Sequence, residues 1–152
     1  MSVERPFSQE ILARRRWMGL AARSGPDRLR ELLPDLPAHE LLRTPEIGAV
    51  MVQGRAGGTG TPFNLGEMTV TRCSVRLASG EVGHAHVQGR DRDHARRAAI
   101  LDALMQTDAA PDLEGKVLSP LAQEEAARRA SRAARAATTR VEFFTLVRGE
   151  DQ

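Results

Sequence analysis

The sequence contains few aromatic residues and a single cysteine. Its 152 residues include no tyrosine, one tryptophan and four phenylalanines, and Cys73 is the one cysteine. One thiol can form neither an internal disulfide nor the ligand set of an iron–sulfur cluster. No aromatic side chains are interleaved with the basic residues, as binders of single strands or RNA require. We therefore expect no nucleic-acid partner and keep nucleic-acid binding as the weakest of the functions considered.

Long apolar runs are also absent. No run approaches the roughly 18 residues of a membrane-spanning helix, and the chain does not open with the pattern of a signal peptide. These features predict a cytoplasmic protein that does not associate with a membrane.

The apolar residues that are present are mostly small. Hydrophobic residues make up 41% of the chain, which is enough for one core, but alanine dominates the second half. Low buried area per residue favours a subunit of an obligate assembly over a free monomer. The net charge is +2 and the pI is near 9.4. Arginine far outnumbers lysine, which favours fork-shaped contacts with carboxylates or phosphates.

Three helices are predicted from apolar spacing and capping residues. The first covers residues 8–22 and is capped by its opening serine, and a short second helix covers residues 27–33 before a proline-rich connection. The third begins at Asp91 or Asp93 and runs to about residue 106, with an apolar stripe along one side.

A fourth predicted helix has an unusual composition. Residues 107–118 are predicted to be a polar loop, followed by Ser119 as N-cap, Pro120 as first helical residue and a helix over 121–137. We expect an inner face of alanines that packs closely and, on the other side, a basic ridge. The ridge is either a solvated face or a surface that docks onto another subunit. The alanines are Ala122, Ala126, Ala130, Ala133, Ala134 and Ala137, and the ridge consists of Arg128, Arg132 and Arg135.

Four strands are predicted from β-branched and alternating residues. They cover residues 47–53, 67–77, 82–88 and 141–147, and the second and third form an antiparallel hairpin. A slip in the alternation near Cys73 predicts a bulge, with Thr69, Thr71, Arg72 and Arg76 on the polar side.

These elements predict an α+β fold in which a small antiparallel sheet of three to four strands, with one hairpin, is flanked by helices. We expect one domain over residues 1–152. It would comprise an N-terminal helical arm (1–45), a section of strands, hairpin and helix (46–106), and an alanine- and arginine-rich helix with a C-terminal strand (119–149).

A glycine-rich loop follows the first predicted strand. Residues 52–63 contain four of the thirteen glycines, and their opening Val-Gln-Gly-Arg recurs at residues 87–90, so two strand ends could each present an arginine. The loop is either a structural or partner-docking turn or an anion site, because successive N–H groups of glycines can cradle an anion. It lacks the Lys-Ser/Thr of a P-loop. The candidate anion-binding residues are Arg55, Gly57, Gly58, Gly60, Arg72 and Arg90.

Other candidate sites have simpler interpretations. Arg90 and the helix start beside it could bind a phosphate, but Asp91 and Asp93 favour an ordinary capped helix. His84 and His86 share one side of a strand, with Cys73 and His94 nearby, a spacing that permits a metal without requiring one. We find no convincing nucleophile or paired acid and base. We therefore predict no catalytic residue, no metal site and no cofactor in this chain.

Several stretches in collinear order carry a resemblance over nearly the whole chain. They are residues 57–60, 65–72, 75–77, 87–91, 94–95, 101–105 and 140–149, together with Arg15, Trp17 and Met18. In these stretches the sequence resembles the PhnG family, the G subunit of the bacterial carbon–phosphorus lyase core complex.

This resemblance implies a role in phosphonate catabolism, in which the G, H, I and L subunits displace adenine from ATP by a phosphonate to give ribose 1-phosphonate 5-triphosphate. It implies ATP and magnesium as substrate of the complex, and PhnI, PhnH, PhnJ and PhnL-type partners in a symmetric hetero-oligomer. The resemblance supplies no catalytic residue to carry over. We therefore expect an interface-forming subunit, or alternatively one that contributes anion-binding residues to a shared active site.

Overall fold

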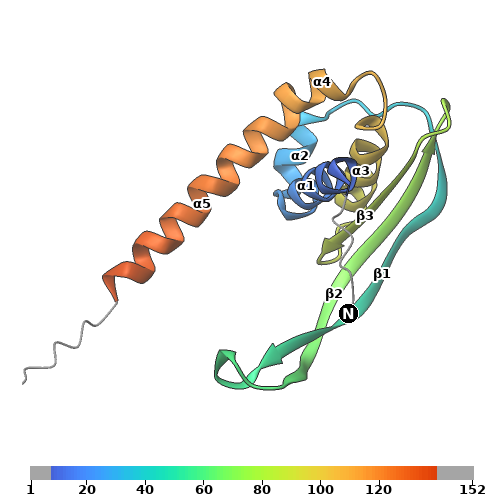
Figure 1. Ribbon diagram of the computed structural model, residues 1–152. Helices are drawn as coiled ribbons and strands as arrows, with labels where there is room; N and C mark the ends of the chain where they lie inside the picture. Colours follow the sequence, from blue (N-terminus) through green and yellow to red (C-terminus); the bar gives the residue numbers. More distant parts are fainter. Residues whose placement is uncertain (1–7, 140–152) are drawn as a thin grey trace, which may run out of the picture.

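The structure is a computed structural model that describes residues 8–139, and it has a curved three-stranded sheet with helices on one side (Figure 1). This architecture confirms the predicted α+β class. The strand predicted over 141–147 lies outside the described residues, and the division into domains stays a prediction. The strands are β1 (His39–Arg55), β2 (Pro62–Leu77) and β3 (Val82–Gln88); the helices are α1 (Gln9–Arg23), α2 (Pro26–Leu32), α3 (Arg92–Leu104), α4 (Ala110–Leu113) and α5 (Ser119–Thr138), with short turns at Ala56–Gly58 and Glu114–Leu118.

The sheet has the order β1-β2-β3, and both neighbouring pairs are antiparallel. The predicted β2–β3 hairpin is confirmed, and β1 and β2 form a second, much longer hairpin. β1 begins at His39 rather than at residue 47, and β2 at Pro62 rather than at residue 67. Local propensity did not reveal these extensions, because pairing between the strands continues on both sides of Pro45, which itself has no partner in the ladder.

A bulge lies opposite Cys73, but the extra residue is on β1, so the prediction of a bulge within β2 at Cys73 is wrong. Thr44 and Pro45 of β1 face the single residue Cys73 of β2. A proline lacks the N–H that a regular ladder needs, so a bulge is a site that tolerates it. The Cys73 thiol donates to the Arg43 carbonyl oxygen over 3.5 Å.

One face of the sheet is buried against the helices. On β2 its members are Thr71, Cys73, Val75 and Leu77, and the matching positions of β3 include Ala85 and Val87. The expectation that Thr71 lies on the polar side is wrong, because its hydroxyl is satisfied internally and donates to the Gly89 carbonyl oxygen over 2.7 Å.

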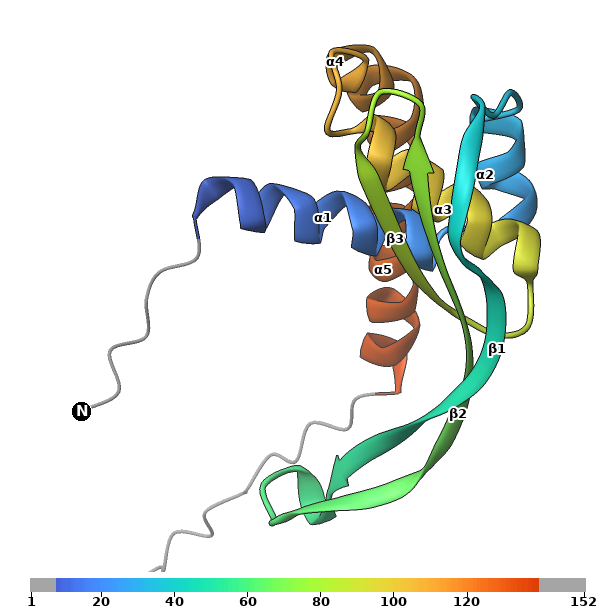
Figure 2. The ribbon, with the colours of Figure 1, turned by 90° about the vertical axis from the view of Figure 1, so that its right-hand side faces the viewer.

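α3 and α1 cover this buried face, with α3 packed directly on β2 and β3, and α2 packs against α3 (Figure 2). The predicted caps are confirmed: Ser8 accepts from the Ile11 N–H and Asp91 accepts from the His94 N–H. At Gly83 the strand meets α3 so closely that a Cβ would overlap the Ala99 carbonyl and lie 2.6 Å from the Ala103 nitrogen.

Asp102 ties α1 and β3 to α3. Its side chain is fully buried and accepts from Arg14 over 2.8 and 3.1 Å and from the Trp17 indole N–H over 2.8 Å. The backbone N–H of His84 is a fourth donor, at 2.9 Å. A buried carboxylate requires this degree of hydrogen bonding to offset its lost hydration.

The loop predicted over residues 107–118 is present at 107–109 but wrong for 110–118. α4 and the wide turn Glu114–Leu118 are helical and lead directly into α5, burying Leu113, Val117 and Leu118. Ser119 therefore does not cap a helix, because Leu118 before it is already helical.

α5 projects away from the rest of the chain (Figure 1). Every residue from 126 to 139 is exposed. The predicted close-packed inner face is therefore wrong for the alanines beyond the first turns, namely Ala126, Ala130, Ala133, Ala134 and Ala137. No helix over residues 8–139 combines the length and apolar character that crossing a membrane requires.

Candidate functional site

The most prominent surface feature is the end of the β1–β2 hairpin, residues 49–55 and 62–69, which we call the β-arm. β3 ends at Gln88, opposite Val70, whereas β1 and β2 stay paired as far as Arg55 and Pro62. In the described chain the β-arm thus has two strands and no third. At about 3.3 Å per residue it extends about 20 Å beyond the three-stranded sheet (Figure 1).

The β-arm carries large apolar side chains that residues 8–139 leave about half exposed or more. Met51 is 53% exposed, Phe63 45% and Leu65 67%. Leu65 is the extra residue at a register shift between Gly66 and Asn64, so it bulges from β2. A two-stranded ribbon without a packed face is only marginally stable in water. We did not identify these residues as a candidate site from the sequence. The signal for them is that large apolar residues occur just before and just after the glycine-rich loop.

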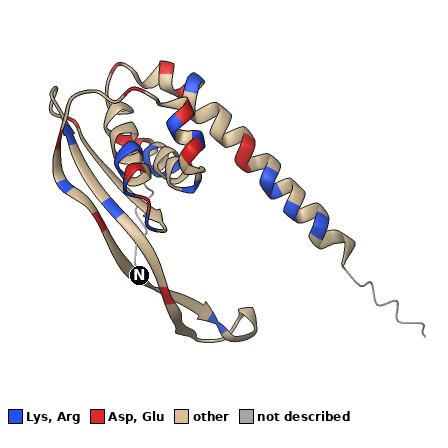
Figure 3. Cartoon of the chain, turned by 180° about the vertical axis from the view of Figure 1, so that it is seen from behind, with Lys and Arg blue, Asp and Glu red and all other residues tan. Residues whose placement is uncertain are grey.

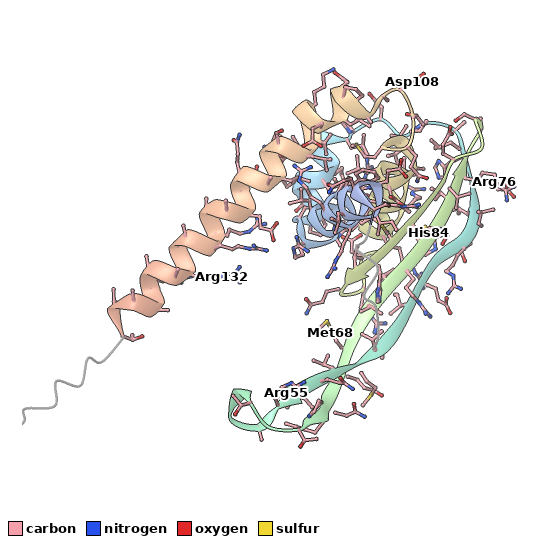
Figure 4. The ribbon with its side chains drawn as sticks, viewed as in Figure 1. Arg55, Met68, Arg76, His84, Asp108 and Arg132 are labelled. Atoms are coloured by element: carbon pink, nitrogen blue, oxygen red, sulfur yellow. The ribbon has the colours of Figure 1, made fainter. Side chains whose placement is uncertain are left out.

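The glycine-rich loop forms the tip of the β-arm. Gly57 and Gly58 have φ values of 60° and 79°, a backbone region that other residues rarely adopt. The guanidinium of Arg55 donates to the Gly60 carbonyl oxygen over 3.0 Å, which closes the loop on itself. Figure 4 shows Arg55 at this end of the molecule, far from the helices. The structure therefore brings together the predicted residues Arg55, Gly57, Gly58 and Gly60.

The other two predicted anion-binding arginines lie elsewhere. Arg72 is on the open face of the sheet, with its guanidinium 3.7 Å from the Glu46 carboxylate. Arg90 is exposed and follows Gly89, whose φ is 95°. β1 and β3 run in the same direction, but β1 continues past the end of β3, so the two Val-Gln-Gly-Arg copies end at different levels of the sheet. Within one chain these three arginines do not converge.

The predicted basic ridge lies on the projecting part of α5. Arg128, Arg132 and Arg135 line a shallow hollow together with Arg23 of α1, Glu125 and Ser131. Figure 3 shows basic residues following one another along this part of the helix. The structure thus groups the three arginines, and it adds Arg23, which the sequence had not indicated.

Two carboxylates fix the base of α5 to the body. Arg23 donates to Glu125 over 2.7 Å, and Arg28 donates to Glu124 over 2.8 Å. The hydrogen bond from Arg23 holds the pKa of Glu125 below its ordinary value of 4.5. These contacts set the direction in which α5 leaves the body.

The considered metal ligands do not converge on one point. His84 lies on the open face and shares a 2.9 Å hydrogen bond with Ser74, whereas Cys73 lies on the buried face. His94 is also buried, with Nε2 2.9 Å from the Ala21 carbonyl oxygen. Residues 8–139 hold no cluster of three or more His, Cys, Asp or Glu side chains suited to a metal ion.

Cys73 is unsuited to nucleophilic chemistry. Burial raises the pKa of its thiol, and nearby Arg96 offsets only part of that rise. Nucleophilic cysteines instead have a lowered pKa and partial exposure. Asp93, the other group with a perturbed pKa in this region, accepts from Arg97 over 2.8 Å and from Arg96 over 3.0 Å. Burial would raise the pKa of Asp93, but these hydrogen bonds outweigh it and lower the pKa, as in a structural ion-pair cluster.

Comparison with known proteins gives two findings. Residues 12–149 match the family described as phosphonate metabolism protein PhnG. A curated relative from Rhizobium meliloti (strain 1021), the alpha-D-ribose 1-methylphosphonate 5-triphosphate synthase subunit PhnG, is 44% identical over 144 residues, which cover 93% of this chain and 92% of that protein.

Proposed function

The chain belongs to the PhnG family, and we propose that its part in phosphonate metabolism is to form subunit interfaces rather than to carry out chemistry. It is a subunit of alpha-D-ribose 1-methylphosphonate 5-triphosphate synthase, a multisubunit enzyme.

The observation that carries the proposal is the β-arm. It leaves the core with Met51, Phe63 and Leu65 largely exposed, and exposed apolar groups of this kind mark protein interaction sites. Burying each of these side chains would contribute about 1.5 kcal/mol or more. Binding would also stabilise a ribbon that is marginal alone. Catalysis has no comparable support, because among the carboxylates of residues 8–139 with a lowered pKa, Asp93 and Glu125 are held in ion pairs and Glu81 accepts a hydrogen bond from Ser79 in an exposed turn.

The partners we propose are subunits of the PhnI, PhnH, PhnJ and PhnL types in a symmetric cytoplasmic hetero-oligomer. We further propose that the assembly acts on ATP, with magnesium, and a phosphonate, displacing adenine. In this proposal the chain itself holds no cofactor, and the substrates bind where several subunits meet.

Coexpression with the other synthase subunits tests the role of the β-arm. The variant Met51→Ser with Leu65→Ser removes two apolar side chains that the interface would bury. We expect this subunit to be incorporated into the synthase about a hundredfold more weakly, since about 3 kcal/mol of binding free energy is lost. Gln53→Ser with Asn64→Ser changes two polar residues of the same ribbon and serves as the matched control. Incorporation is measured by size-exclusion chromatography and native mass spectrometry. If the apolar variant assembles as well as the control, the β-arm is not the interface.

A second candidate function is that the tip of the β-arm enters an active site shared with a partner subunit. The observation that favours it is the position of Arg55 and the open backbone of Gly57 and Gly58, where no atom lies within 4 Å of an added Cβ. Backbone N–H groups in such turns can face an anion such as a triphosphate.

Arg55→Gln, compared with Arg92→Gln on α3, separates the two candidates. A shared site predicts that assembly is unchanged while adenine release falls at least about tenfold, because a charged hydrogen bond to an anion is lost. Unchanged adenine release from an intact complex would remove this second candidate and leave the interface role.

A further inference from the structure

The projecting half of α5 is strongly basic. Between residues 126 and 138 the sequence contains four arginines and no acidic residue. Arg129 is the member of this group that has an internal partner, Glu125, at 2.9 Å. Among the ion pairs and hydrogen bonds of residues 8–139, none joins an acidic side chain to Arg128, Arg132 or Arg135. This positive charge therefore has no counterpart within the described chain.

The three arginines continue the side of α5 that packs against the body. Leu121 is buried and Glu125 binds Arg23, and both belong to the first turns of the helix. From Leu121 the spacing is four, three, four and three residues, through Glu125, Arg128, Arg132 and Arg135. This is the alternation of the contact positions in a two-helix coiled coil. Leu121 and Glu125 are already engaged with the body, so we call the three residues beyond them, Arg128, Arg132 and Arg135, the α5 seam.

The residues beside the seam leave room for another helix. Ser131 and Ala136 flank the arginines and are small, so a neighbouring backbone can approach while the guanidinium groups stay accessible. Figure 4 shows the Arg132 side chain leaving α5 on the side on which α1 and the sheet also lie. Arg23 borders the same hollow and adds a further positive charge.

We propose that the α5 seam docks an acidic α-helix of another synthase subunit, one with Asp or Glu at the same three- and four-residue spacing. The proposal rests on the proposed interface role and specifies the chemistry of one partner surface. Guanidinium groups form paired hydrogen bonds with carboxylates, so such a helix would neutralise the unpaired charge and fix the register. The seam spacing favours a helix over a nucleic acid, whose binders combine basic grooves with aromatic platforms that α5 lacks.

Zero-length crosslinking in the assembled synthase tests the proposal. The chain has one lysine, Lys116, so Arg132→Lys keeps the charge and places a new amine in the seam. Ala130→Lys places the same amine on the exposed, opposite side of the same helix and is the matched control. We expect carbodiimide to couple position 132, and not position 130, to an Asp or Glu on a helix of another subunit, as identified by mass spectrometry.

Charge reversal supplies an independent readout. Arg128→Glu with Arg132→Glu should weaken incorporation into the complex at least about tenfold, and Arg15→Glu with Arg92→Glu, which makes the same change in net charge elsewhere, should not. Absence of an intersubunit crosslink from position 132, equal coupling at position 130, or nuclease-sensitive retention of nucleic acid by the seam would each overturn the proposal. An intact complex that still depends on Met51 and Leu65 but shows no seam crosslink would refute this inference alone, leaving the interface role of the β-arm in place.

Discussion

Asp102 accepts hydrogen bonds from two arginine nitrogens, an indole and a backbone N–H, and it lies among apolar neighbours on α3. Its partners Arg14 and Trp17 are more than eighty residues away in the sequence. A single residue thus connects α1, α3 and β3, and the loss of its carboxylate should be measurable as lost stability of the whole subunit.

We expect Asp102→Ala to lower the free energy of unfolding by about 3–5 kcal/mol, because it leaves the Trp17 indole N–H and the His84 N–H without their acceptor. It also removes the carboxylate partner of the half-buried Arg14 guanidinium, which keeps the Val82 carbonyl oxygen as acceptor. Asp102→Asn should cost less, since the amide oxygen keeps part of the network. Urea unfolding followed by Trp17 fluorescence measures both. Equal stability of wild type and Asp102→Ala would contradict the role given to this carboxylate.

Gly83 makes a different residue-scale prediction. A methyl group there collides with the backbone of α3, so Gly83→Ala should destabilise the subunit by about 3 kcal/mol or more, or abolish folding. Gly66→Ala is the matched control on β2, because nothing lies within 4 Å of the added carbon. Thermal unfolding of the two variants should separate clearly, and similar midpoints would show that strand and helix can move apart at little cost.

Some of these residues could be predicted from sequence and others could not. The caps Ser8 and Asp91 act on N–H groups three residues ahead, so a local pattern was sufficient. Asp102 depends on distant partners, and nothing adjacent to it in the sequence identifies them. The predicted anion-binding residues come together only in part. Arg55 and Arg72 lie on the same pair of strands, but far apart along it.

Among the elements, α5 has the least support from the core. Leu121 is buried, and beyond it the helix is held by Arg23–Glu125 and Arg28–Glu124. The orientation of α5 therefore depends on carboxylates that must be ionised.

This dependence predicts a pH effect on α5. The pKa of Glu125 is lowered in the folded chain, so its contribution is fully present above its ordinary value of 4.5 and is lost as pH falls through the lowered value. Spin labels placed by Arg15→Cys and Ala134→Cys, on a Cys73→Ser background, should show one narrow distance distribution at pH 7 that broadens in acid. Glu125→Gln should broaden it already at pH 7, whereas Glu67→Gln, a change to an exposed carboxylate of the β-arm, should not. A narrow distribution in Glu125→Gln would mean that packing alone orients the helix.

Element lengths were the least predictable feature. β1 is seventeen residues long and passes through Pro45, which a propensity argument places outside a strand. The length of β1 is set by its pairing with β2, which runs from His39 to Arg55. The helical path through residues 110–118 was missed for a related reason, since its apolar residues are few and their burial depends on α1 and α2.

At the scale of the whole molecule, a small core supports parts that project from it. The β-arm extends past the sheet, α5 extends past its last buried residue, and Ile11 and Leu12 at the start of α1 are 52% and 43% exposed. The low content of bulky residues indicated a subunit of an assembly, and family membership agrees. The sequence did not show which surfaces stay uncovered, because that follows from where β3 and the core end.

Hydrogen exchange tests the central claim, that this subunit works by docking its projecting parts onto partners. The account predicts that amides of residues 49–55 and 62–69 exchange rapidly in the isolated chain and become at least about a hundredfold more protected in the assembled synthase, while α3 is protected in both. Equal exchange of the β-arm in the free and assembled states would contradict the account.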